Sequence, residues 1–188
     1  MRPRKPTVEE VRAAYGRRLP NVLAPGLEVV FCGINPGLYS AAVGYHFARP
    51  GNRFWAALHA SGFTDRLLEP HEQTQMLDFG CGLTNIVARS TAVAAELSTE
   101  ELRHGRDLLQ RRVRRYEPRW LAVLGKGAYR KAFGRPRAEF GRQEDELAGA
   151  GIWLLPNPSG LNARYQPPEL AEMFRELREA ARSSRGRR

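Results

Sequence analysis

The chain of 188 residues lacks the features that mark metal-binding, secreted and membrane proteins. Its two cysteines, Cys32 and Cys81, are far apart in sequence and have no other ligand residue at metal-binding spacing, which argues against zinc and iron–sulfur motifs. No apolar run approaches the roughly 20 residues that span a bilayer, and the first ten residues do not lead into a signal sequence. The sequence therefore predicts a cytoplasmic protein with no metal or organic cofactor and no membrane partner.

Lysine is scarce, although the net charge is +10. Of the 30 lysines and arginines only Lys5, Lys126 and Lys131 are lysines. The 30 basic residues outnumber the 20 acidic residues. Guanidinium groups suit phosphate and base-edge contacts, so this surplus favours a polyanionic partner such as nucleic acid. A surface that merely keeps the protein soluble is the alternative.

Apolar runs alternate with helical patterns along the chain. Buried strands are expected at 27–34, 120–125 and 151–156, and helices at 52–60, at 69–79, after the capping box that begins at Ser98, and around Leu170, Met173, Phe174 and Leu177. This pattern predicts one α/β domain with a largely parallel central sheet at residues 23–181. A basic N-terminal arm (1–22) and a basic tail (182–188) would flank it.

Two stiff turns follow predicted strands. Asn35-Pro36-Gly37 comes after the first strand and Asn157-Pro158-Ser159-Gly160-Leu161 after the third, at sheet ends where α/β sites gather. We expect them to share a cleft between neighbouring strands; ordinary strand-ending turns are the alternative. No glycine-rich phosphate fingerprint is present, and the four histidines are scattered in the sequence. An asparagine-centred site suits the positioning of a water, as hydrolysis of an N-glycosidic bond to a pyrimidine requires.

These two turns resemble motifs of the mismatch-specific uracil/thymine DNA glycosylases, the Mug and thymine-DNA glycosylase branch of the uracil-DNA glycosylase superfamily. The segments 47–55, 62–65, 82–85 and 124–126 follow in the family's order, so that the resemblance covers residues 23–179. It implies a three-layer α/β/α sandwich. It also implies a monomeric, nucleoid-associated base excision repair enzyme that flips uracil, or another damaged pyrimidine, out of a mismatch with guanine in double-stranded DNA. Hydrolysis would leave an abasic site.

The resemblance also assigns roles to individual residues. Asn35 would position the hydrolytic water, and the Phe47 ring would stack on the base. The other base-pocket residues would be Gly33, Ile34, Ser40 and Asn157. The wedge that fills the vacated stack and meets the widowed guanine would comprise Ser159, Gly160, Leu161, Asn162 and Arg164. For Phe47 and Leu161, ordinary core packing is the alternative.

Three positions depart from the family pattern. Asn35 and Asn157 stand where many members of the wider superfamily have an aspartate and a histidine, which predicts slower chemistry. Ala88 stands where the family usually has an acidic residue, so this chain would have lost a catalytic acid at that position. Ala88→Asp is therefore expected to raise the single-turnover rate. A mismatch- or lesion-binding protein with little catalysis and a small-molecule nucleoside hydrolase remain as alternatives. The arginines at 103–119 could form a solvated face or track phosphates.

Overall fold

Five strands form one sheet in the order β2-β1-β3-β5-β4 in the computed structural model, which describes residues 4–160 and 164–183. The first four strands in that order are parallel, and β4 pairs antiparallel with β5 at the edge. Their bounds are β1 Val29–Gly33, β2 Cys81–Asn85, β3 Trp120–Leu124, β4 Gly141–Leu147 and β5 Ala150–Leu155. The parallel strands therefore present their carboxyl ends along one edge.

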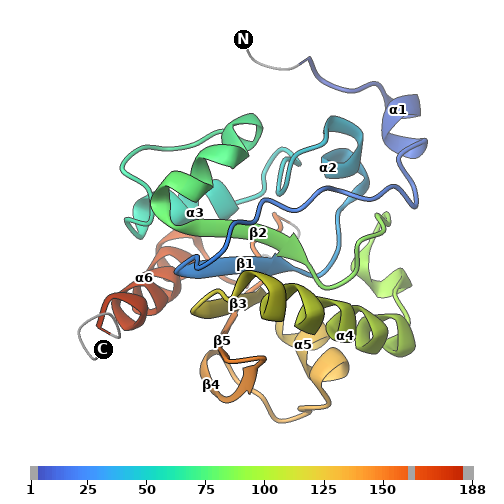
Figure 1. Cartoon of the computed structure of the whole chain (residues 1–188). Coiled ribbons are helices and arrows are strands. Elements are labelled where there is room, and N and C mark those ends of the chain that lie inside the picture. The colour runs from blue at the N-terminus through green and yellow to red at the C-terminus, as the bar shows by residue number, and fades with distance from the viewer. Residues whose placement is uncertain (1–3, 161–163, 184–188) are drawn as a thin grey trace.

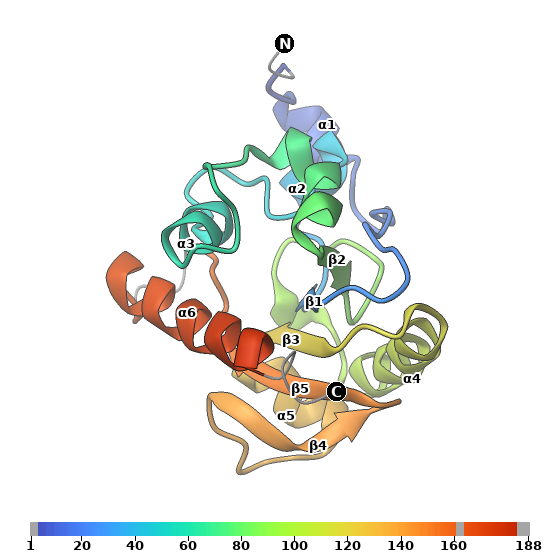
Figure 2. The ribbon, with the colours of Figure 1, turned by 60° about the vertical axis from the view of Figure 1, so that its left-hand side comes forward.

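Helices cover both faces of this sheet. Alternate side chains of β1 enter different clusters, Val29 and Phe31 on one face and Val30 and Cys32 on the other. The first face packs against α3, α6 and a 3₁₀ helix, and the second against α4 and α5; α3 and α6 lie together in Figures 1 and 2. The bounds are α3 Phe54–Ala60, the 3₁₀ helix Pro70–Phe79, α4 Thr99–Tyr116, α5 Lys126–Phe133 and α6 Pro167–Ser183. The predicted α/β/α fold is confirmed.

The strands predicted from apolar runs and the predicted helices are present, with small shifts of their ends. The capping box is formed as expected, with Ser98 Oγ accepting from Glu101 N at 3.0 Å and Glu101 Oε2 accepting from Ser98 N at 3.0 Å. The segment predicted as a helix at 69–79 is a 3₁₀ helix. No pattern predicted β2, β4, the short helix α2 (Leu38–Val43) or α5.

The segment that precedes β1 packs along the body of the domain. Its short helix α1 (Val8–Arg12) contacts α2, and Val22 pairs with Leu83 of β2. Ala14 and Leu19 are buried. None of the helices within residues 4–160 and 164–183 is both long and apolar enough to cross a lipid bilayer.

Candidate active site

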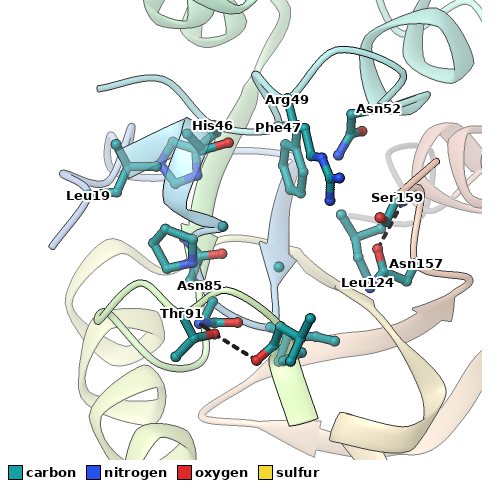
Figure 3. A pocket seen from close by; sticks show the side chains of 18 of the residues that line it. Leu19, His46, Phe47, Arg49, Asn52, Asn85, Thr91, Leu124, Asn157 and Ser159 are labelled. Carbon is teal, nitrogen blue, oxygen red and sulfur yellow. Dashed lines mark hydrogen bonds between the residues drawn. The ribbon is translucent and has the colours of Figure 1, made fainter. Parts of the chain in front are cut away.

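A pocket of about 410 Å³ lies at the carboxyl ends of the parallel strands (Figure 3). Asn35 and Asn157 both line it, as the two turns predicted. The strands that carry them are not neighbours, however, because β3 lies between β1 and β5. The expectation of adjacent strands was wrong. Gly125, the residue that follows β3, has φ +136°, and a Cβ there would come within 2.9 Å of Ile34 Cδ1, so a missing side chain lets the flanking turns approach each other.

Hydrogen bonds determine which way the Asn35 amide faces. Asn35 Nδ2 donates to the carbonyl oxygen of Arg89 at 3.0 Å and to Thr91 Oγ1 at 2.7 Å. A carbonyl can only accept, and the Thr91 hydroxyl uses its own proton on the Val93 carbonyl at 2.9 Å, so the amide nitrogen must be the atom on this side. Among the described residues, nothing donates to Asn35 Oδ1. The site therefore offers an oriented acceptor.

The loop that holds Asn35 is itself held by the N-terminal segment. Ser90, between the two partners of Asn35, accepts at its carbonyl from Gly16 N at 3.0 Å and donates its N–H to the Arg17 carbonyl at 2.9 Å. Its hydroxyl donates to the Ala14 carbonyl. Arg89 also pairs with Glu101 at 2.7 Å, which lowers the pKa of that carboxyl to about 2. Residues far apart in sequence thus fix one catalytic candidate.

Phe47 forms an aromatic wall of the pocket in a strained backbone conformation. Its φ of +53° lies in the left-handed region, which bulky residues rarely adopt. The ring stacks on Phe54 with centroids 4.1 Å apart, and the flanking amides of His46 and Ala48 donate to side-chain oxygens of Gln73 and Ser40. The surroundings hold the strained residue in place, which is typical of functional positions.

Asn85 is a pocket residue that the sequence did not single out. It ends β2, is 5% exposed, and lines the pocket beside Gly33. A Cβ on Gly33 would meet Asn85 Oδ1 at 2.5 Å and the Phe47 ring at 3.4 Å, so the glycine keeps a space open between amide and ring. The segment 82–85, one of the segments that follow the family's order, could have pointed to Asn85. Only the pairing of β2 with β1, however, places Asn85 opposite Gly33.

The groups in or near the pocket that could act as nucleophile or proton carrier are neutral. Burial lowers the pKa of His46 to about 4, and its Nε2 lies 2.9 Å from the Pro20 carbonyl, which requires a proton on that nitrogen. Burial also raises the pKa of Cys32, a free thiol, to about 12. Within residues 4–160 and 164–183, no group of three His, Cys, Asp or Glu side chains could hold a metal.

The second turn is braced against the segment that leads into α3. Asn157 Oδ1 accepts from Ser159 N at 3.0 Å, and the Arg53 guanidinium donates to the carbonyls of Ser159, at 3.0 Å, and Tyr165. A Cβ on Gly160 would lie 2.5 Å from the Gly51 carbonyl oxygen, so this contact requires glycine. Leu161 and Asn162, the expected tip of the wedge, lie outside the described residues.

The structure brings most of the predicted site residues to one pocket and leaves others away from it. Ala88 and Arg164 are exposed and do not line the pocket, and the Arg164 guanidinium lies 5.9 Å from the centroid of the Tyr165 ring. The predicted residues on the pocket wall are Gly33, Ile34, Asn35, Ser40, Phe47, Asn157 and Ser159. Of the arginines at 103–119, Arg112 is turned inward and donates to Thr84 Oγ1 at 2.5 Å.

Comparisons with known proteins show the family and agree with the fold. The model of the family described as the uracil DNA glycosylase superfamily matches residues 20–180. The solution NMR structure of a Methanosarcina acetivorans protein, provisionally assigned as a uracil DNA glycosylase, superposes with a TM-score of 0.57 at 22% identity. The match covers 87% of this chain and 98% of that one. At this identity the structural likeness supports the fold alone.

Proposed function

This chain belongs to the uracil DNA glycosylase superfamily, and we propose that it removes uracil and other damaged pyrimidines opposite guanine in double-stranded DNA. The reaction is hydrolysis of the N-glycosidic bond, which leaves an abasic site for base excision repair. The observation that carries the proposal is the fixed amide of Asn35, whose Nδ2 is engaged by Arg89 and Thr91.

A dissociative hydrolysis fits a pocket without a general base. The bond between the sugar C1′ and the base N1 breaks with its electron pair leaving on the base, and an oxocarbenium-like sugar remains. Asn35 Oδ1 would accept a hydrogen bond from the water that attacks C1′, and the released proton passes to solvent or to the base. Among the described residues that line the pocket there is no Asp or Glu, so positioning and hydrogen bonding supply the catalysis.

Phe47 and Asn85 would recognise the extruded base. The Phe47 ring provides one stacking face, and the Asn85 amide carries both a donor and an acceptor, the pair that the O4 and N3–H groups of uracil require. Gly33, Ile34, Ser40 and Asn157 would complete the pocket that encloses the base.

The turn after β5 would act on the duplex. Leu161 is proposed to fill the stack vacated by the base, and its neighbours Ser159, Gly160, Asn162 and Arg164 to meet the widowed guanine and the backbone. Extrusion costs a few kcal/mol and costs less at a mismatch, which supplies part of the selectivity. The bracing of Ser159 and Gly160 by the segment 51–53 supports this role, because a wedge must resist the stacked bases.

The test uses a 5′-labelled duplex with one G:U pair, followed by alkaline cleavage at abasic sites. Wild-type protein is expected to give strand scission, and Asn35→Ala to lose it. Asn21→Ala is the matched control, because Asn21 is also an asparagine in a hydrogen-bonded network, accepting from Thr84 Oγ1 at 2.7 Å, but it does not line the pocket.

Other outcomes would point to other functions. Tight binding of the G:U duplex without scission, even in Ala88→Asp, would replace the proposal by a mismatch- or lesion-binding protein. Hydrolysis of free deoxyuridine without action on the duplex would indicate a nucleoside hydrolase.

A further inference from the structure

The mouth of the pocket carries a charge that the hydrolytic step does not use. Among the described residues that line the pocket, Arg49 is the one side chain charged at neutral pH, since burial keeps His46 neutral. Within the described part of the chain, the Arg49 side chain makes no ion pair or hydrogen bond. Arg130 and Arg135, by contrast, each bind a carboxylate. The exposed Arg49 guanidinium is therefore available for an external anion.

The backbone that carries Arg49 is rigid. Asn52 N donates to the Arg49 carbonyl at 2.9 Å across a turn whose centre is Pro50 and Gly51, and Gly51 has φ +83°. A proline at the second position and a glycine with positive φ at the third define a type II turn. Asn52 Oδ1 in turn accepts from Phe54 N at 2.9 Å, at the start of α3. Arg49 is thus presented from a preorganised turn.

The position of Arg49 distinguishes it from the base-binding groups. Figure 3 shows its guanidinium beside Phe47, on the side of the pocket that carries Asn157 and Ser159. Arg49 is exposed, whereas Asn85, beside Gly33, is 5% exposed. When a nucleotide enters such a pocket, its base occupies the buried part, and its sugar and flanking phosphates stay at the mouth.

We propose that Arg49 forms a phosphate subsite, which binds one phosphodiester group next to the extruded nucleotide on the same strand. This inference rests on the proposed function and adds the ligand group for this side chain. The planar guanidinium can donate two parallel hydrogen bonds to the two free oxygens of a phosphodiester. Because no carboxylate lines the pocket among the described residues, nothing there competes for the guanidinium. The contact would hold the strand so that C1′ stays near Asn35.

The test combines a protein variant with a chemical change in the DNA. G:U duplexes carry a neutral methylphosphonate at a single linkage, placed in turn at each of the positions flanking the uracil. Single-turnover cleavage and fluorescence-anisotropy binding are measured for wild type, Arg49→Ala and Arg49→Lys. Arg137→Ala, which removes an exposed arginine of a separate surface groove, is the control for loss of one charge.

Arg49→Ala is expected to weaken binding about 5- to 20-fold and to reduce the salt dependence of binding by about one counterion. One methylphosphonate position should cause the same loss in wild type and no further loss in Arg49→Ala. The affinity of Arg49→Lys should lie between those of wild type and Arg49→Ala, and Arg137→Ala should bind as tightly as wild type. Because the Arg49 side chain has no hydrogen-bond or ion-pair partner among the described residues, its replacement should leave the melting temperature unchanged.

Three results would overturn the inference. They are a binding affinity and cleavage rate of Arg49→Ala that both equal those of wild type, losses of affinity that are as large in Arg49→Ala as in wild type at every methylphosphonate position, and a slower bond cleavage in Arg49→Ala with unchanged binding. The last would place the guanidinium on the departing base. If wild type cleaves the G:U duplex in any of these cases, the phosphate subsite fails and the proposed function stands. If wild type cleaves no duplex, the proposed function fails, and the binding measurements still decide whether Arg49 contacts one phosphate.

Discussion

Replacement of Thr91 by valine is expected to slow base removal while leaving DNA binding intact. Thr91 is 1% exposed. Its hydroxyl lies between Asn35 Nδ2, at 2.7 Å, and the Val93 carbonyl, at 2.9 Å. Valine has nearly the same shape but no hydroxyl. Asn35 Nδ2 then keeps only the Arg89 carbonyl at 3.0 Å, so its amide plane is held at one point instead of two.

The size of the effect follows from the bonds that are lost. The Val93 carbonyl also accepts from Glu96 N at 3.2 Å, so it keeps a partner when the hydroxyl is removed, and the main loss is one hydrogen bond to Asn35. Such a bond contributes about 1–2 kcal/mol, which corresponds to a fall of about 5- to 30-fold in the single-turnover rate if it is felt mainly in the transition state. The DNA concentration that gives half-saturation should change little, because Thr91 is buried and its hydroxyl contacts Asn35 and not the surface of the protein.

Thr64→Val provides a matched control. Thr64 is 4% exposed, and its hydroxyl donates to the carbonyl two residues ahead at 2.8 Å, as that of Thr91 does, but it does not line the pocket. Both variants should lower the free energy of unfolding by about 1 kcal/mol in urea, and only Thr91→Val should lose rate. Thr91→Ser should keep the rate. Equal rates for Thr91→Val and wild type, while Asn35→Ala is inactive, would refute the idea that amide orientation matters.

Two further perturbations test the pocket. Asn85→Asp keeps the shape of the side chain but removes its hydrogen-bond donor and adds a charge that repels the departing base anion. The single-turnover rate of uracil removal should therefore fall about 10- to 100-fold. An unchanged rate would show that Asn85 does not recognise the base. For His46, the unfolded chain binds a proton near pH 6.5 but the folded chain only near pH 4, so stability is full above about pH 6.5 and declines as the pH falls towards 4. Urea denaturation should show a loss of about 2 kcal/mol between pH 7 and pH 5 that is absent in His46→Gln, and a parallel loss in both proteins would contradict this assignment.

Local patterns predicted the parts of the fold that bury a continuous apolar surface. The continuous apolar run at 29–33 indicates a strand covered on two faces, and α4 shows its apolar stripe at Leu102, Leu109 and Val113. The edge strand β4 has the sequence GRQEDEL and is half exposed, so it carries no such signal. β2 is short and contains glycine, threonine and asparagine, which are not typical of a buried strand. These residues are buried because neighbouring parts of the fold cover them.

The site was predictable only as far as it depends on motifs. The two turns identified Asn35 and Asn157, but the orientation of Asn35 depends on Thr91, 56 residues later in the chain. The role of Asn85 depends on the pairing of β2 with β1, and the meeting of the two turns depends on Gly125 at the end of the strand between them. These are non-local relations, which no window of sequence contains. The prediction about Ala88 stays untested, although its exposed position gives it no place on the pocket wall.

The wide spacing of the pocket residues along the chain has a consequence for biosynthesis. The wall begins at Leu19 and ends at Ser159, and β5, which carries the last portion, must pair with β3 before the two turns face each other. A nascent polypeptide that has completed β1, β2 and β3 already has much of its core, yet it still lacks one side of the cavity. Substrate binding should therefore arise late in translation and in a single step. Ribosome-bound fragments that end before residue 150 should have no partial activity towards DNA.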